Sequence, residues 1–371
     1  MIKKLLFPFI ICYFLLTGCS NNRTYEEITF SSWGSVSEVK IIKGLIKNYE
    51  KENPNIKIKF IHIPQNYFQK IHLLFASNTA PDIIFINNLY LPVYESHLED
   101  LTNDIDKNAF YPQAISGLSY NDKILAFPRD ISNVVFYVNL DLLAQKGLSL
   151  PSENWTLNDL LNYAQKATSN QVYGISYEDD IYWALPYLNY FGGAILSDDL
   201  KYMMINSDKS MKGMNFYKNL RYKYKVSPQR SDIGSSTLAQ MFLDKKIVFY
   251  LSGRWMFPKI KEKADFNWAI INFPIGEKGV PCDSSGWAIP KSSKHKAQAL
   301  KSAKYLSNEK NSEYFAKTGL IVPARIEASK LLNNNQFNEK VFLSIIKTSH
   351  KTPVNKNYKQ TVDKINKSIE W

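Results

Sequence analysis

The sequence predicts an α/β protein with two domains, and three observations support this prediction. The chain has 371 residues, which is too many for one ordinary hydrophobic core. Apolar residues make up 45% of the chain and charged residues 22%, a balance typical of globular proteins that excludes intrinsic disorder. Strand-like and helix-like segments alternate between residues 28 and 86, an order typical of a parallel sheet with helical crossovers.

The N-terminal segment, residues 1–18, is predicted to be a signal peptide. Lys3 and Lys4 precede an apolar stretch, Leu5 to Leu16, that is too short to span a hydrocarbon core of ~30 Å but suits a signal peptide. The sequence LTGC that ends at Cys19 resembles the bacterial lipobox. This resemblance implies cleavage before Cys19, acylation of its thiol (a palmitate-type lipid anchor), and a lipidated tether at residues 19–24. The alternative is an ordinary signal peptide with a chance cysteine.

The next segments alternate between strand and helix. The elements predicted are a strand at 28–30, a helix at 37–52, a strand at 56–60, a helix at 67–77 and a strand at 83–86. The apolar face of the first helix consists of Val39, Ile42, Leu45, Ile46 and Tyr49. Ligands bind at the carboxyl ends of strands in such sheets, and these ends carry Trp33 and the pair Asn87-Asn88. Asp82, at the entry to the last of these strands, is interpreted as structural.

The second half of the chain is mostly helical between its strands. The predicted elements are a strand at 133–139, helices at 157–167, 181–190, 211–224 and 238–243, strands at 247–251 and 268–271, a helix at 294–306, and a further helix that ends near 319. Thr156 and Asp159 have the spacing of a capping box at the start of the helix 157–167.

Cysteine and charge counts narrow the class of function. Cys12 and Cys19 lie in or beside the signal segment and Cys282 stands alone, so no internal disulfide pair or four-cysteine zinc site is expected. The formal charge of +12 falls to +10 (44 basic minus 34 acidic residues) once Lys3 and Lys4 are removed. Because few of the basic residues are arginine, the side chain that reads bases best, a nucleic-acid partner is not expected.

At this point the chain resembles the extracellular solute-binding proteins of ABC importers, in the cluster that binds sugars and includes maltose-binding protein. The resemblance is carried, in order, by the opening strand and helix with Trp33 and Glu38, by PDIIFINN at 81–88, FPRDISNVVFYVN at 127–139, DKKIVFYLSGRW at 244–255, and the segments SSGWAIPKSSKHKAQALKSAKYLS and GLIVPAR between 284 and 325. The sequence departs from the family pattern at Asn88, where a carboxylate is common, and at Ser284 and Ser285, where glycine is common.

The resemblance implies the two-lobed type II periplasmic-binding-protein fold, with hinge-linked lobes and a ligand cleft between them. The first lobe (N-lobe) would comprise 25–132 and 265–300, and the second (C-lobe) 136–260 and 303–371. The protein would be a monomeric binding lipoprotein on the outer face of the cell membrane. It would deliver a sugar to a membrane permease and would require neither catalysis nor a cofactor.

The residue types support a sugar ligand independently of the resemblance. Aromatic residues make up 14% of the chain, and sugar rings stack on aromatic faces while amides, hydroxyls and carboxylates bind their hydroxyl groups. The candidate ligand-binding residues are Trp33, Asn88, Asp130, Tyr182, Trp183, Trp255, Ser285, Trp287 and Arg325. For each tryptophan the alternative is a place in the hydrophobic core.

Three arginines, Arg129, Arg254 and Arg325, lie beside the motifs. They would suit an acidic sugar, although pairing within the protein is the favoured interpretation.

Two other functions stay open. A binding protein for a polyamine, a peptide or a metal chelate would combine aromatic residues with a carboxylate-lined cleft. A secreted glycosidase would need two placed carboxylates, and nothing in the sequence marks such a pair. The five histidines show no metal-binding spacing.

Overall fold

The computed structural model describes residues 25–333 and 336–369. Cys12, Cys19, the predicted signal peptide and the predicted tether lie outside the described residues. None of the helices in the described ranges is long and apolar enough to cross a bilayer.

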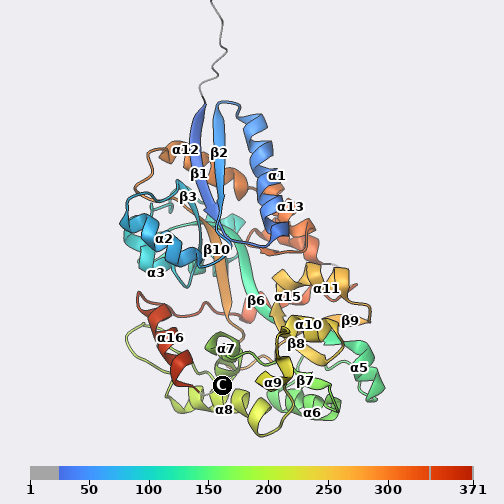
Figure 1. Cartoon of the computed structure of the whole chain (residues 1–371). Helices are drawn as coiled ribbons and strands as arrows, with labels where there is room; N and C mark the ends of the chain where they lie inside the picture. Colours follow the sequence, from blue (N-terminus) through green and yellow to red (C-terminus); the bar gives the residue numbers. More distant parts are fainter. Residues whose placement is uncertain (1–24, 334–335, 370–371) are drawn as a thin grey trace, which may run out of the picture.

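One long strand, β6 (Phe127–Asn139), belongs to both lobes of the molecule (Figure 1). Its first half pairs antiparallel with β10 (Cys282–Ala288). From Val134 onward it pairs with β8 (Ile247–Gly253) and β9 (Trp268–Asn272). The main path of the sheet in the described chain is β2-β1-β3-β10-β6-β8-β7, so two sets of strands meet on β6.

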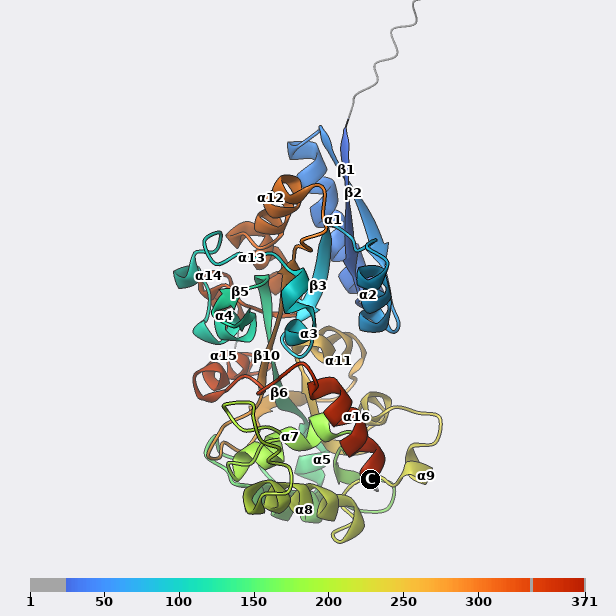
Figure 2. The same ribbon diagram turned by 90° about the vertical axis from the view of Figure 1, so that its left-hand side faces the viewer.

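The first lobe forms the upper part of the molecule in both views, and α1 and α12 flank its sheet (Figures 1 and 2). In addition to the first half of β6 and β10, its elements are β1 (Glu26–Ser32), α1 (Val36–Glu52), β2 (Ile56–His62), α2 (Tyr67–Ala76), β3 (Ile83–Asn87), α3 (Leu91–Tyr94), η1 (Glu95–His97), η2 (Lys107–Ala109), α4 (Pro112–Gly117), β4 (Ser119–Tyr120), β5 (Lys123–Ile124), α12 (Lys296–Leu306), α13 (Glu309–Lys317), β11 (Val322–Pro323), α14 (Ile326–Ser329) and η4 (Lys330–Leu332).

The second lobe lies below the first (Figure 2). In addition to the second half of β6, β8 and β9, its elements are α5 (Leu140–Gln145), α6 (Leu157–Ala167), β7 (Tyr173–Ile175), α7 (Ile181–Tyr190), α8 (Asp208–Tyr222), α9 (Arg230–Ile233), α10 (Leu238–Leu243), η3 (Arg254–Met256), α11 (Phe257–Lys263) and α16 (Tyr358–Ser368). Two short helices, α15 (Val341–Ser344) and η5 (Ile345–Thr348), lie where the lobes meet.

Helix α1 is stabilised by a capped N-terminus and by a buried apolar face. The Ser35 hydroxyl accepts a hydrogen bond from the Glu38 amide (3.2 Å) and so caps the first turn. All five apolar side chains predicted to face inward are buried. Burial of each such side chain contributes about 1.5–3 kcal/mol, which explains why the 3.6-residue period predicted this helix correctly.

β3 is a central strand of the sheet, between β1 and β10, and its apolar run is buried on both faces. Asp82, just before it, accepts hydrogen bonds from the Thr29 amide and hydroxyl (both 2.7 Å) and from the Ser293 hydroxyl (2.7 Å). The structural role predicted for Asp82 is therefore confirmed.

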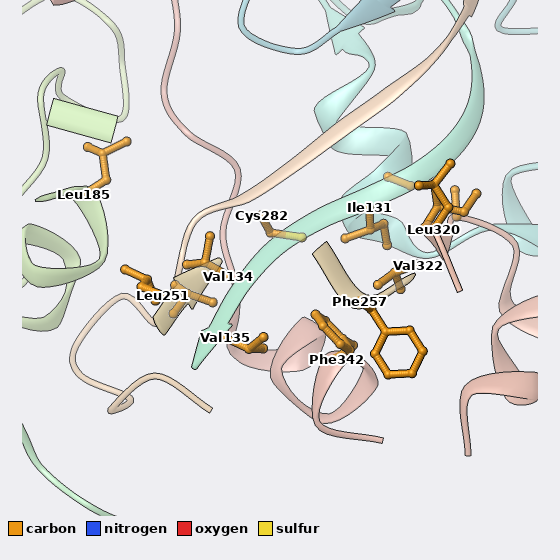
Figure 3. Packing of buried hydrophobic residues seen from close by; sticks show 14 of the residues in the cluster. Ile131, Val134, Val135, Leu185, Leu251, Phe257, Cys282, Leu320, Val322 and Phe342 are labelled. Atoms are coloured by element: carbon orange, nitrogen blue, oxygen red, sulfur yellow. The ribbon is translucent and has the colours of Figure 1, made fainter. Parts of the chain in front are cut away.

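Apolar side chains pack closely where β6 passes between the lobes. Figure 3 shows Ile131, Val134 and Val135 of β6 near Cys282 of β10 and Phe342 of α15. All five are buried and belong to one continuous hydrophobic cluster. The junction is therefore a packed region of the core rather than a flexible linker.

Two segments group differently from the predicted lobe boundaries. Strand β9, within the segment 265–300 assigned to the N-lobe, pairs with residues 135–139 in the second half of β6. Helix α13, within the segment 303–371 assigned to the C-lobe, packs against α12, α14 and β11 in the first lobe. Only two residues separate α12 from α13, so α13 stays beside its neighbour.

We predict that Thr156→Ala lowers the free energy of unfolding by about 1 kcal/mol, because it removes the capping box of α6. The Asp159 amide donates to the Thr156 hydroxyl (3.1 Å), and the Thr156 amide donates to the Asp159 carboxylate (2.8 Å). Urea unfolding measures the change. The exposed Gln165→Ala in the same helix is the control, and an equal loss in both variants would contradict the capping argument.

Candidate ligand-binding cleft

A cavity of about 330 Å³ lies between the two lobes beside β6. Its volume is at the lower end of the range for small-molecule sites, about 300–1,000 Å³. Its walls come from the ends of β1 and β3, from β6 and β10, from the start of α7 and from the turn after β8. Five of the nine predicted ligand-binding residues line it: Trp33, Asp130, Tyr182, Trp255 and Ser285.

Aromatic rings reach this cavity from both lobes. Trp33 follows β1 in the first lobe, where its ring packs edge-on against Phe68 (5.0 Å between centroids) and tilted against Phe85 (4.7 Å). Tyr182 and Trp255 belong to the second lobe, and Trp255 is 39% exposed. The cavity thus has a braced tryptophan on one side and an uncovered tryptophan on the other.

Gly253 permits the position of Trp255. A Cβ atom at residue 253 would lie 2.0 Å from the Trp255 ring, which no side chain could tolerate. The glycine at the end of β8 therefore allows the indole to lie against the backbone of the strand, beside the cavity.

A buried ion-pair network forms the floor of the cavity. Arg129 donates through Nη1 to Glu38 (2.5 Å) and through Nε to Asp130 (2.6 Å), and its Nη2 also pairs with Asp130. The Ser285 hydroxyl donates to the other oxygen of Asp130. Burial lowers the pKa of Arg129, but the carboxylates of Asp130 and Glu38 outweigh it and leave the pKa raised.

A β-bulge explains why two consecutive residues of β6 share this network. Ser285 pairs with Asp130 and Gly286 pairs with Pro128, so Arg129 is an extra residue with no partner on β10. Side chains normally alternate between the faces of a strand, and a bulge redirects one of them. Pro128 is tolerated beside this bulge, where the regular ladder is interrupted, because it has no amide hydrogen to donate to the sheet.

Asp283 is a buried carboxylate in the wall of the cavity. Its Oδ1 accepts hydrogen bonds from Asn88 (Nδ2, 2.7 Å) and from the Thr352 hydroxyl (2.9 Å). Burial raises the pKa of Asp283, while the hydrogen bonds from Asn88 and Thr352 oppose the rise. Because Asn88, Asp283 and Thr352 come from three distant parts of the chain, this group ties them together.

The model of the bacterial extracellular solute-binding protein family matches residues 44–341, most of the chain. The chain belongs to this family. The resemblance identified from the sequence is thereby confirmed, and an extracellular family places the protein outside the cytoplasm.

Relatives and solved structures of this solute-binding protein agree with that assignment. The galactooligosaccharide-binding protein of Bacillus subtilis (strain 168) is 24% identical over 300 residues, which cover 76% of this chain and 69% of the relative. An ABC substrate-binding protein from Listeria monocytogenes, solved in complex with cycloalternan, is 25% identical with a TM-score of 0.85, covering 92% of each chain. The GacH receptor of Streptomyces glaucescens GLA.O, solved unliganded and with acarbose, is 21% identical with a TM-score of 0.80, covering 92% of this chain and 91% of that one. The predicted two-lobed type II fold is therefore confirmed.

Two of the predicted tryptophans do not line the cleft of this solute-binding protein. Trp287 has no exposed surface, because its ring lies between Phe30 and Phe85 (centroids 5.0 and 5.5 Å away). The prediction that Trp287 stacks on a ligand is wrong, and the alternative of a core tryptophan holds. Trp183 lies outside the cavity lining and packs edge-on against Tyr182 at 5.5 Å.

Asn88 also differs from its predicted role, since both ends of its amide bind the protein. Its Nδ2 donates to Asp283 and its Oδ1 accepts from the Ser284 amide (3.1 Å). The neighbouring Asn87 lines the cavity instead. Successive strand side chains point to opposite faces, so Phe85 and Asn87 share the cavity face while Asn88 points away.

The arginines beside the motifs are paired within the protein. Besides Arg129, Arg254 is buried and pairs with Glu339 (2.5 Å), with its guanidinium 4.2 Å from the ring of Phe257. Arg325 lies outside the cavity, where its Nε donates to the Ser307 carbonyl (2.6 Å) and burial lowers its pKa. Internal pairing, the interpretation favoured from the sequence, is therefore what the geometry presents for Arg129 and Arg254, whereas Arg325 bonds to a backbone carbonyl.

Apart from Arg129 and Arg254, five polar residues that line the cavity were not among the predicted ligand-binding residues: Glu38, Asn87, Ser132, Asp283 and Ser284. Glu38 lies in the first turn of α1, which follows the carboxyl end of β1, so its position shortly after Trp33 was a usable signal. A prediction of Asn87 would require knowing which residues of β3 point to the cavity face. A prediction of Asp283 would require knowing which strands pair with β10. Cys282, next to Asp283, is buried with a raised thiol pKa, which makes it a poor nucleophile. Within the described ranges no cluster of His, Cys, Asp and Glu could hold a metal ion.

We predict that Asp283→Asn removes a pH-dependent cost of folding. A carboxyl group whose pKa is raised in the folded protein stabilises that protein least once the pH exceeds this pKa. Wild type should therefore lose stability relative to the variant as the pH rises from about 3.9, the ordinary pKa of aspartate. The neighbouring Tyr182, Tyr358 and Cys282 have raised pKa values and stay neutral over this window.

Urea unfolding of both proteins between pH 4 and 8 measures this difference. The exposed Asp122→Asn is the control for the loss of one negative charge. If the free energy of unfolding of wild type rises relative to that of Asp283→Asn as the pH rises, the Asp283 carboxylate is stabilised in the folded protein, contrary to the prediction.

Proposed function

We propose that this protein is the substrate-binding lipoprotein of an ABC importer, which captures a sugar or oligosaccharide in the cleft and delivers it to a membrane permease. The observation that carries the proposal is that Trp33 and Trp255 line one cavity from different lobes. A pyranose ring has apolar C–H faces that stack on indoles, and its hydroxyl groups need polar partners at the edge. The relatives named for galactooligosaccharides and solved with cycloalternan support the same class of ligand.

The polar groups around the cavity suit hydroxyl groups. Asp130 and Ser285 form a hydrogen-bonded pair at its floor, and Glu38 and Asn87 lie beside Trp33 in the lining. Carboxylates and amides accept hydrogen bonds from hydroxyl donors, and the fixed geometry of the ion pairs orients these acceptors before a ligand arrives.

Ligand binding would close the lobes. β6 crosses between them, so a rotation about this strand changes the separation of Trp33 and Trp255. A ligand favours the closed form only to the extent that it binds that form more tightly than the open one. The closed lobes would then be the form that the permease recognises, with the binding protein acting as a monomer.

The protein would act without catalysis and without a cofactor. Glu38 and Asp130 are both held by Arg129, which disfavours the proton exchange that a glycosidase requires of its acid. Prolonged incubation with an oligosaccharide panel, followed by chromatography, should return every saccharide intact. The appearance of shorter products would overturn this part of the proposal.

We predict that Trp255→Ala weakens saccharide binding by about 30-fold or more, the effect expected when a central aromatic anchor worth at least 2 kcal/mol is lost. A thermal-shift screen of mono- and oligosaccharides, with a polyamine and a peptide pool as further arms, first identifies the ligand. Calorimetry with that ligand then compares the variant with wild type.

The control for this prediction is Tyr202→Ala, which removes a 65%-exposed aromatic side chain of the second lobe outside the cavity lining. It should leave the affinity unchanged. Equal losses in the two variants, or binding of only the polyamine or the peptides, would contradict the proposed saccharide site.

We predict that Cys19→Ser abolishes membrane association, because the acyl chains would be attached to the Cys19 thiol. Each buried CH₂ group of such chains contributes about 0.8 kcal/mol, and two or more chains anchor a protein stably. Detergent phase partition and metabolic labelling with an alkyne-palmitate should recover wild type in the detergent phase with label. Label on the variant would show that another residue carries the lipid.

A further inference from the structure

The arginines that line the cavity are already neutralised by the protein. Arg129 is held by the two carboxylates Glu38 and Asp130, and it is only 7% exposed. Arg254 is held by Glu339, and these two side chains are 4% and 7% exposed. Neither guanidinium therefore offers an uncompensated positive charge to a ligand.

Two nitrogen atoms of Arg254, Nε and Nη1, have no hydrogen-bond partner in the described chain. They do not form an anion site, because both atoms are buried and the guanidinium lies between the rings of Phe257 (4.2 Å) and Phe342 (5.1 Å). The aromatic faces take up part of their charge.

The charges of the lining are therefore biased toward the negative. Glu38, Asp130 and Asp283 line the cavity along with the two arginines, and the described lining contains no lysine. Counting Glu339, which neutralises Arg254, four carboxyl groups face two guanidinium groups. Even with Asp283 protonated, the local balance stays negative.

Asn87 offers an acceptor to a ligand in this cavity. The side-chain oxygen of Asn87 is buried and has no hydrogen-bond partner within the described chain, although Asn87 lines the cavity. A buried acceptor without a partner destabilises the unliganded protein, so a ligand that donates a hydrogen bond to it gains affinity. A hydroxyl group can donate, whereas a carboxylate or a phosphate dianion cannot.

We propose that the cleft selects neutral saccharides and discriminates against those that carry a carboxylate or phosphate group. This inference rests on the proposed function, since it names the charge class of the saccharide. An anionic substituent would lose its hydration on entering the cleft, meet arginines whose charges are already compensated, and face a lining in which carboxyl groups outnumber guanidinium groups. Glu38 and Asp283 are the residues whose charge sets this discrimination.

Substitution of Glu38 tests this charge selection most directly. Glu38→Gln keeps a side-chain oxygen that can accept from Arg129, but it leaves the guanidinium with one carboxylate instead of two. The cleft then gains one positive charge at the network floor. Asp283→Asn removes another carboxyl group of the lining without altering a contact of Arg129.

The test is calorimetry with a matched pair of ligands: the neutral disaccharide that binds best, and the same disaccharide with one C6 hydroxymethyl group oxidised to a carboxylate. Wild type should bind the acidic form at least about tenfold more weakly, since like-charge contacts cost several kcal/mol and tenfold is about 1.4 kcal/mol. Glu38→Gln and Asp283→Asn should each reduce the ratio between the dissociation constants of the acidic and the neutral disaccharide. Glu27→Gln, an exposed residue of β1 away from the cavity lining, should leave it unchanged.

The outcomes separate the two proposals. Equal or tighter binding of the acidic disaccharide by wild type would overturn the charge selection while leaving the saccharide site intact. A ratio that narrows equally in Glu27→Gln would overturn it as well, because overall charge would then be the cause. If no member of the saccharide panel binds wild type, the proposed function itself fails. Circular dichroism of each variant confirms its fold, and Asp283→Asn serves where Glu38→Gln does not fold.

Discussion

The continuity of β6 is the constraint on which the rest of the structure depends. Residues 127–133 of this strand pair with β10, and residues 134–139 pair with β8 and β9. Every backbone amide and carbonyl in a buried strand must be paired, so the two halves of the sheet cannot separate without exposing these groups. Four consecutive residues of the first half, 129–132, line the cavity. The position of the cleft thus follows from where one strand changes its partners.

The bulge at Arg129 brings polar side chains of β6 together beside the cavity. A regular strand would direct Arg129 and Asp130 to opposite faces. With the extra residue, both side chains join Glu38 and Ser285 in one network. A buried ion pair that lost one partner would cost about 3–5 kcal/mol, so these side chains hold one another in place. Their role is to orient acceptors as well as to stabilise the junction.

A structural feature could be predicted from the sequence when many residues contributed to its pattern, and not when it depended on a single residue. Helix α1 was predictable because a 17-residue amphipathic segment repeats its period several times. A choice of one residue at a strand end has no such redundancy, which is why Asn88 was preferred over Asn87. Trp287 adjoins Gly286, as Trp255 follows Gly253, yet Trp287 lies inside a strand between two others and Trp255 lies beyond the end of one. Only strand order, which is a tertiary property, separates these cases.

The pairing of charges inside the cleft also bears on how a ligand could drive closure. Charged groups that are already compensated need no rearrangement when the lobes approach, so the electrostatic energy of the cleft changes little between the open and closed forms. The differential affinity must then come from the contacts that a ligand makes only when both lobes reach it. For a ligand on Trp33, those contacts are with Tyr182 and Trp255 of the other lobe. A neutral ring can bury both faces there without a desolvation penalty for charge, whereas an ion would oppose the closure it needs.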